Sequence, residues 1–272
     1  MAIREVNKVN SRSTVSVPAN RRIHMKKQLI FHDKFYNEYT FDPAAKLGRM
    51  ESILKEFSDF EVLTPSSALE EDILLVHTED HLIRVRNDLD KAYPIALLAV
   101  GGALLAVDYA LKHQPMFAVI RPPGHHASPD GFWGFCYFNN LAIAVRHAAL
   151  ENTMIIDFDL HFGDGSSNTF VNDHEVTYYA CEGATSESLI SNMEKFLSQQ
   201  KDVDLLAVSA GFDRHIDDWG GLLSTEDYFT IGKILKSFDE NECANRRFAC
   251  LEGGYNHNVL GKNVRAFIDG FY

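Results

Sequence analysis

Residues 154–165, MIIDFDLHFGDG, run from an apolar segment directly into a loop of Asp, His and Gly. The segment has the composition of a buried strand, and the polar side chains begin where that strand ends. Three more apolar runs make the same transition, ending at Ile120 before RPPGHHASPDGFWGF, at Val208 before SAGFDRHIDDWGG and at Leu251 before EGGYNH. In a parallel α/β sheet the carboxyl ends of the strands line the ligand crevice, so these four loops are expected to converge on one site.

Strand-like and helix-like segments alternate along the chain. Strands are predicted at 28–31, 117–120, 154–158, 176–180, 205–209 and 248–251, and helices at 95–112, 140–150, 187–199, 225–240 and 259–271. This alternation is typical of the α/β class, with a mostly parallel sheet covered by helices on both faces. No Pro-rich or Ser-rich linker divides the chain, which favours a single domain over residues 25–272.

Composition excludes several classes of protein. The 272 residues are 46% apolar and 24% charged, which is typical of a globular chain and not of a disordered or fibrous one. The net charge of −12 would repel phosphate backbones, so nucleic acid is not an expected partner. The longest apolar run, 95–107, is shorter than the roughly 20 residues that cross a bilayer, so no membrane partner is expected either.

The four cysteines and the first 24 residues bear on location and processing. The cysteines are scattered without a CxxC pair, which favours a reducing cytoplasm over a disulfide framework or a cysteine zinc site. Residues 1–24 carry five basic residues and one acid, without apolar periodicity. We interpret them as a disordered leader or a tag remnant, with a transit peptide as the alternative.

Two of the loops carry residues suited to metal binding. Asp157, Asp159 and His161 are spaced by two after a strand and would lean to the same side of an extended backbone. Asp213, in another of the loops, could complete a three-ligand site with Asp159 and His161 that leaves coordination open for water and substrate. Such a donor set suits Zn²⁺ but does not exclude Fe²⁺, Co²⁺ or Mn²⁺. Taken alone, the DxH pattern could also be a solvated loop.

The other two loops carry groups suited to acid–base and oxyanion chemistry. His125 and His126 follow a Pro-Pro-Gly turn, and carboxylates such as Asp157 and Asp164 could orient their far ring nitrogens. Gly253 and the glycine after it would allow close approach to a ligand, and the phenol that follows could donate to a developing oxyanion.

Five motifs in sequence resemble the zinc-dependent histone deacetylase family, including its microbial members and the acetylpolyamine amidohydrolases. The motifs are RPPGHHA, GFCYFNN, DFDLHFGDG, SAGFDRHIDD and LEGGY. The resemblance extends over most of the chain from about Met25. It implies the arginase–deacetylase fold, with about eight parallel strands and flanking helices. It also implies that the chain removes an acetyl or other acyl group from an amine such as acetyl-lysine or an acetylpolyamine.

The resemblance also implies roles for individual residues. Zinc would be bound by Asp159, His161 and Asp213. His126 would act as general base and then acid, with electrostatic help from His125. In the remaining roles, Asp157 would pair with His125 and Asp164 with His126, each carboxylate accepting from the imidazole. Tyr255 would polarise the amide carbonyl, and Phe135, with Gly134 beside it, would form a tunnel wall. Members of the family often bind a monovalent cation, K⁺ or Na⁺, near the DxDxH loop, partly through main-chain oxygens.

The chain departs from the family pattern in segments around the expected site. The usual entry motif is degraded to FDPAAKLGRM, in which Arg49 is the remnant of a buried channel arginine. The segment CEGATSESL is short and lacks the loop that supplies one tunnel wall in many relatives. Trp133 and Trp219 are expected to line the rim or to anchor their loops. Cys136 is expected to pack in the wall, and His77, with two further histidines at helix-like positions, to be structural.

Alternatives remain at the level of function. The same fold could serve as a noncatalytic zinc-binding protein or could hydrolyse another small amide. A different chemistry, the hydrolysis of a guanidine group with two metal ions, is a further alternative. The sequence leaves open whether the acylated amine is a protein lysine or a polyamine, how long the acyl chain is, and which oligomer forms.

Overall fold

The computed structural model describes residues 27–272, so the predicted leader at 1–24 lies outside the described residues. Seven strands are found within this range, all paired in parallel, in the order β2-β1-β3-β7-β6-β4-β5. They are β1 (Gln28–Ile30), β2 (Glu61–Leu63), β3 (Met116–Ala118), β4 (Thr153–Asp157), β5 (Val176–Ala180), β6 (Leu205–Ala210) and β7 (Arg247–Leu251). The predicted fold class is confirmed, with seven described strands where about eight were expected.

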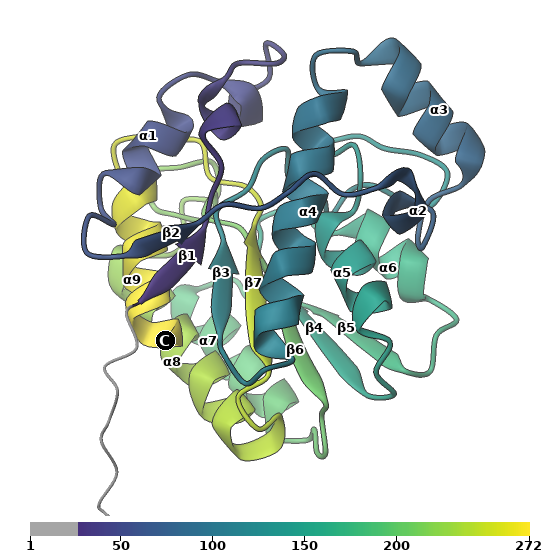
Figure 1. The fold of residues 1–272 in the computed structure, drawn as a ribbon. Coiled ribbons are helices and arrows are strands. Elements are labelled where there is room, and N and C mark those ends of the chain that lie inside the picture. The colour runs from purple at the N-terminus through teal and green to yellow at the C-terminus, as the bar shows by residue number, and fades with distance from the viewer. Residues whose placement is uncertain (1–26) are drawn as a thin grey trace, which may run out of the picture.

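Helices cover both faces of the sheet (Figure 1). They are α1 (Arg49–Leu54), α2 (Glu70–Ile73), α3 (Glu79–Asp88), α4 (Tyr93–Ala110), α5 (Asn140–Ala148), α6 (Asp164–Phe170), α7 (Ser186–Leu197), α8 (Thr225–Glu242) and α9 (Leu260–Phe271). Helices α4 and α5 pack together on one face, and α8 and α9 pack together on the other. This division follows from right-handed crossovers, because the chain moves across the sheet in one direction through α4, α5 and α6 and returns through α7 and α8.

Helix α4 is long and apolar enough, by length and composition alone, to cross a membrane. In the structure most of it is buried, and it packs against α5, β3 and β7. Its apolar character is therefore explained by a place in the core. The four cysteines are buried and free, and the expected cytoplasmic location stays a prediction.

The four loops singled out in the sequence follow four strands that lie next to one another, β3, β7, β6 and β4. The registers align the ends of these strands, since Asp157 pairs with Ser209 and Ser209 pairs with Cys250. The loops therefore emerge side by side from one edge of the sheet. The direction of the chain across the sheet also reverses in this region, which is where open α/β sheets form their binding crevices.

Two histidines of the core brace the loop after β3. His77 Nδ1 lies 3.0 Å from the Ser128 carbonyl, and His77 Nε2 accepts a hydrogen bond from the Asn139 amide at 2.9 Å. His81 Nε2 lies 2.8 Å from the Tyr137 carbonyl, and the two imidazoles stack with their centroids 4.6 Å apart. Both side chains are buried, as the structural interpretation of these histidines predicts.

Acidification is expected to destabilise the fold through His77. Burial, and then the neighbouring His81, lower the pKa of His77 from 6.5 to about 3. The unfolded chain therefore binds one more proton than the folded chain between these two values, and stability is lost as the pH falls through 6.5 toward 3. The free energy of unfolding should lose up to about 1.4 kcal/mol per pH unit through this residue.

Urea denaturation at pH 6 and pH 5 measures this dependence. The His77→Gln variant should show a shallower loss of unfolding free energy than the wild type, by about one proton's slope. His147→Gln is the matched control, because it removes an exposed histidine of α5 and leaves the buried His77 in place. Equal slopes in the wild type and His77→Gln would show that His77 does not carry the dependence.

Candidate active site

The end of β4 and the end of β6 bring three potential metal ligands together. The Asp159 carboxylate accepts hydrogen bonds from the His161 amide at 3.0 Å and from the Gly253 amide at 2.8 Å. The Asp213 carboxylate accepts one from the Leu160 amide at 3.0 Å. Each carboxylate is thus held by backbone of a neighbouring loop, which fixes the geometry of the group before any ligand binds.

The donor atoms of Asp159, His161 and Asp213 fit a single cation. One ligand atom from each residue lies within 4.8 Å of the other two. His161 Nδ1 is 3.3 Å from Asp159 Oδ1 and 3.1 Å from Asp213 Oδ2. Asp213 Oδ2 is buried and accepts no hydrogen bond of suitable geometry, although His161 Nδ1 lies close to it. A buried carboxylate oxygen without a donor is costly unless a cation binds it, so this atom supports a metal-binding role.

The charges of this group are strongly perturbed. Burial, together with the charge of Asp159, raises the pKa of Asp213 to about 6. The close carboxylates of Asp159 and then Asp213 raise the pKa of His161 to about 10. The buried carboxylates of Asp159 and Asp213 lie within 4.8 Å of each other and therefore require a positive charge between them. Protonated His161 would provide such a charge, and so would a divalent cation.

The tandem histidines each face a carboxylate. His125 Nδ1 lies 3.0 Å from Asp157 Oδ2, and His126 Nδ1 lies 2.7 Å from Asp164 Oδ1. Asp157 is itself fixed, since it accepts hydrogen bonds from the Tyr178 hydroxyl at 2.9 Å and from the Asp159 amide at 3.0 Å. These bonds leave the Nε2 atom of each imidazole free to face the metal ligands.

The two histidines differ in their electrostatic surroundings. Burial opposes protonation of His125, but the charges of Asp159 and Asp157 outweigh it and raise its pKa well above the usual value. Burial, and then the neighbouring His125, lower the pKa of His126. His125 therefore favours its charged form and His126 its neutral form. Two neighbouring titratable groups whose pKa values are shifted apart in this way are typical of acid–base catalysis.

Gly134 and Phe135 border His126 in a tight turn. Both have positive φ, 60° and 68°. A Cβ at Gly134 would lie 2.4 Å from His126 Cδ2, so only glycine permits this close approach. The Phe135 ring faces the Tyr255 ring edge-on, with centroids 5.9 Å apart.

Tyr255 is held by the loop that follows β6. Its amide and that of Asn256 both donate to Asp218 Oδ2 at 2.8 Å, and its ring stacks on Trp219 with centroids 4.1 Å apart. Burial raises the pKa of Tyr255 well above 10, and the charges of Asp159 and Asp213 raise it further. The phenol is therefore protonated at neutral pH and can act as a hydrogen-bond donor.

Trp133 contacts both members of the His126–Asp164 pair. Its indole Nε1 donates to Asp164 Oδ2 at 2.8 Å, and its ring lies 4.0 Å from the His126 ring. The sequence analysis placed Trp133 at the rim or as an anchor without identifying these partners. The available signal was only its position one residue before Gly134.

Two buried residues support the site, of which the sequence analysis singled out only Arg49. Arg49 is fully buried, and its guanidinium donates to the carbonyls of Gly254 at 2.9 Å and Glu252 at 2.6 Å. Glu252, which was not singled out from the sequence, accepts from the Gly124 amide at 2.6 Å and the His125 amide at 3.2 Å. Arg49 thus ties the loop that carries Tyr255 to α1, and Glu252 ties the same loop to the one that carries the histidines.

A second group of potential ligands, His125, Cys136 and Glu252, also lies within 4.8 Å. Here the Glu252 carboxylate is already used by backbone amides, and burial raises the pKa of the Cys136 thiol well above its usual value, which disfavours the thiolate that a metal requires. We therefore assign this group to the packing of the wall, where Cys136 was expected.

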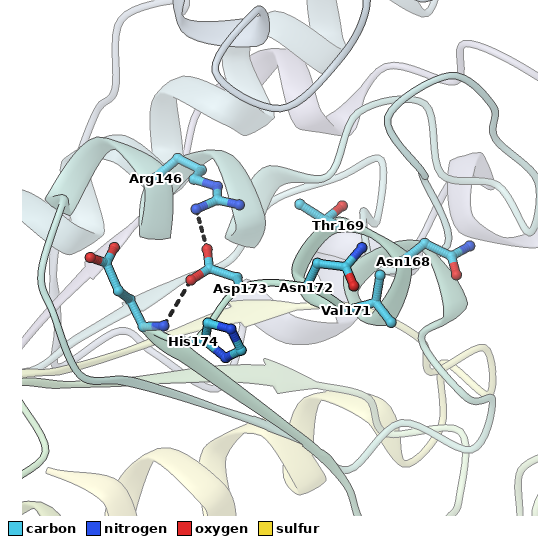
Figure 2. Close-up of a pocket in the computed structure, with 8 residues that line it drawn as sticks. Arg146, Asn168, Thr169, Val171, Asn172, Asp173 and His174 are labelled. Carbon is cyan, nitrogen blue, oxygen red and sulfur yellow. Dashed lines mark hydrogen bonds and ion pairs between the residues drawn. The ribbon is translucent and has the colours of Figure 1, made fainter.

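A pocket of about 260 Å³ opens beside the site, lined by Asp159, His161, Arg214 and the short segment after β5. A larger pocket, of about 420 Å³, lies near the amino end of β5 (Figure 2). There Arg146 and Asp173 form an ion pair, and the Asp173 carboxylate also accepts a hydrogen bond from the Glu175 amide at 2.8 Å. The charges of Arg146 and Asp173 are thus paired with each other.

Comparisons with known proteins agree with this geometry. A family model described as "Histone deacetylase domain" matches residues 42–186 and 180–271. The chain belongs to the histone deacetylase family. A probable deacetylase of Methanothermobacter thermautotrophicus is 29% identical over 302 residues, which cover 89% of this chain and 90% of that protein. A probable deacetylase of Archaeoglobus fulgidus is 30% identical, over 80% of this chain and 74% of that protein.

More distant members extend the comparison. The polyamine deacetylase HDAC10 of Danio rerio is 28% identical, over 72% of this deacetylase-family chain and 38% of that protein. The crystal structure of the HDA15 HD domain superposes with a TM-score of 0.80 at 19% identity, covering 91% of this chain and 90% of that domain. The superposition supports the arginase–deacetylase fold for residues 27–272, which the structure describes.

Proposed function

We propose that this chain is a metal-dependent deacetylase that hydrolyses the amide bond of an acylated amine and releases a carboxylate and a free amine. The proposal rests above all on the tandem histidines beside the Asp159–His161–Asp213 group. The His126 and His161 rings lie 5.9 Å apart, and His125 Nε2 lies 3.8 Å from Asp159 Oδ1. The donor set suits Zn²⁺ and also accepts Fe²⁺, Co²⁺ or Mn²⁺. When bound, such a cation supplies Lewis acidity and lowers the pKa of water.

The chain's own residues would move the protons. Because Asp164 fixes His126 through Nδ1, the Nε2 atom of His126 is free to accept a proton from the attacking water and later to give it to the departing amine. His125, held between Asp157 and Asp159, would contribute positive charge close to the reacting carbonyl. The Tyr255 hydroxyl would donate a hydrogen bond to the carbonyl oxygen as negative charge develops there.

Aromatic side chains would hold the acyl-amine stem. Phe135 and Tyr255 face one another, while Trp133 and Trp219 are each about half exposed at the mouth of the site. The net charge of −12 favours a cationic substrate such as a protein lysine segment or a polyamine. The names of the relatives are compatible with both, since one is a polyamine deacetylase and others are histone deacetylases.

Acetate release from a substrate panel tests the proposal. The panel contains an acetyl-lysine peptide, an acetylpolyamine and a longer acyl-lysine, each offered to protein loaded with one equivalent of Zn²⁺. Turnover of one class should fall by about 10²–10³-fold in Tyr255→Phe, because this variant removes one oxyanion donor and keeps the aromatic ring. Full activity of Tyr255→Phe would contradict the assigned role. A metal-loaded wild type that turns over no member of the panel would favour the noncatalytic alternative or another small amide.

A further inference from the structure

The side chain of Arg214, which directly follows the ligand Asp213, reaches across the ends of two strands. Its Nε donates to the carbonyl of Asp159 at 2.9 Å and to that of Phe158 at 3.1 Å. Its Nη2 donates to the carbonyl of Cys181 at 2.8 Å, beyond the end of β5. One guanidinium therefore binds three main-chain oxygens beneath the candidate metal site.

In the family that the chain resembles, a monovalent cation near the DxDxH loop is bound partly by main-chain oxygens of this kind. In this chain the three oxygens already accept hydrogen bonds from Arg214, and the neighbouring carbonyl of Asp157 accepts one from the Cys181 amide at 2.7 Å. A K⁺ or Na⁺ ion among the same oxygens would also lie against the positive charge of the guanidinium. The residues present therefore do not fit the expected monovalent cation.

We propose that Arg214 replaces this monovalent cation, so that the site of this chain is organised without K⁺ or Na⁺. The guanidinium supplies the positive charge beneath the buried carboxylates and fixes the backbone of Asp159. Because Arg214 follows Asp213 in the chain and its side chain binds the Asp159 carbonyl, this one residue also connects the two carboxylate ligands. The inference concerns how the site is built, so it does not depend on which amide is hydrolysed.

The position of Arg214 suits this role. Its backbone is fixed, because its own carbonyl accepts hydrogen bonds from the amides of Leu222 at 2.9 Å and Leu223 at 2.8 Å. The planar guanidinium of an arginine can donate hydrogen bonds to several carbonyls at once, which a lysine ammonium on a flexible side chain does less well. The side chain lines the pocket next to His161, so a small cation from solvent could reach the space that a shorter residue would leave.

Thermal unfolding in different salts tests the proposal without reference to turnover. The wild type is melted in KCl, NaCl and tetramethylammonium chloride at equal ionic strength, the last cation being too large to enter among the carbonyls. The three wild-type melting temperatures should agree within about 1 °C, because no cation is bound. A saturable rise of the wild-type melting temperature with K⁺ or Na⁺ would overturn the proposal.

The variants provide the second arm. Arg214→Ala should melt lower than the wild type in tetramethylammonium chloride and should regain several degrees, saturably, as K⁺ or Na⁺ is added. Arg146→Ala, which removes another partly buried arginine in the remote pocket of Figure 2, is the control and should show no dependence on the cation. A folded Arg214→Ala that responds to neither cation would overturn the proposal. If Arg214→Ala does not fold in any salt, Arg214→Met takes its place, with the same expected rise of the melting temperature in K⁺ or Na⁺. The cation titration of the wild type remains the first test in either case.

Discussion

Replacing Asp213 by Asn is expected to abolish deacetylation and metal binding together. Asn keeps the volume and can still accept the hydrogen bond from the Leu160 amide, but it loses the negative charge of the buried Oδ2 atom, which accepts no hydrogen bond. A neutral amide oxygen is a weak ligand for a divalent cation. We expect kcat/KM to fall by at least about 10⁴-fold, since loss of the cation removes several kcal/mol of transition-state stabilisation and the low pKa of water.

Metal content distinguishes this effect from other causes of inactivity. The wild type should retain one equivalent of Zn²⁺ per chain after gel filtration, and Asp213→Asn well under half an equivalent. Asp164→Asn is the matched control, because its carboxylate faces His126 and not the metal group. It should lose activity and keep its metal. Two equivalents in the wild type would favour binuclear chemistry, and an inactive Asp213→Asn with a full equivalent would remove Asp213 from the ligand set.

The buried parallel strands β4, β6 and β7 could be predicted from the sequence because both of their faces are covered, and their bounds differ from the prediction by one residue. Strand β5 lies at an edge and is only partly buried, but its β-branched and aromatic residues still predicted its bounds. Strand β2 was missed, because it lies at the edge of the sheet, and Glu61 and Val62 are exposed, so it shows no apolar run. Helix α6 was missed as well, because its sequence, DGSSNTF, is rich in residues with low helix propensity.

The same distinction applies to the candidate site. The convergence of the four loops was predicted because the carboxyl ends of parallel strands line one crevice, and the structure brings the predicted residues of all four loops together. The pairing of Asp157 with His125 and of Asp164 with His126 came from the family resemblance. The contacts of Trp133 and Arg214 could not be predicted by either route, because spacing along the chain does not specify how a long side chain crosses from one loop to another.

Replacing His126 by Phe is expected to reduce turnover without loss of the metal. The new ring would keep the packing between His125 and Trp133, whose rings each lie 4.0 Å from that of His126, but would carry no nitrogen to accept a proton. A general base contributes about 10²–10⁴-fold, so kcat should fall by that factor while KM changes by less than about threefold. Steady-state kinetics of acetate release and the zinc content of the same sample measure both expectations.

Trp133→Phe separates the orientation of His126 from its proton transfer. This variant keeps an aromatic ring against the imidazole and loses only the indole donor to Asp164 Oδ2. Because His126 retains both nitrogens and its bond to Asp164, kcat should fall by about tenfold, corresponding to one charge-assisted hydrogen bond of roughly 1.4 kcal/mol. If Trp133→Phe were as inactive as His126→Phe, the indole would have a direct part in the reaction. If His126→Phe kept more than about a tenth of wild-type turnover, proton transfer would have to be assigned to His125. The Nδ1 atom of this imidazole is also held by a carboxylate, that of Asp157.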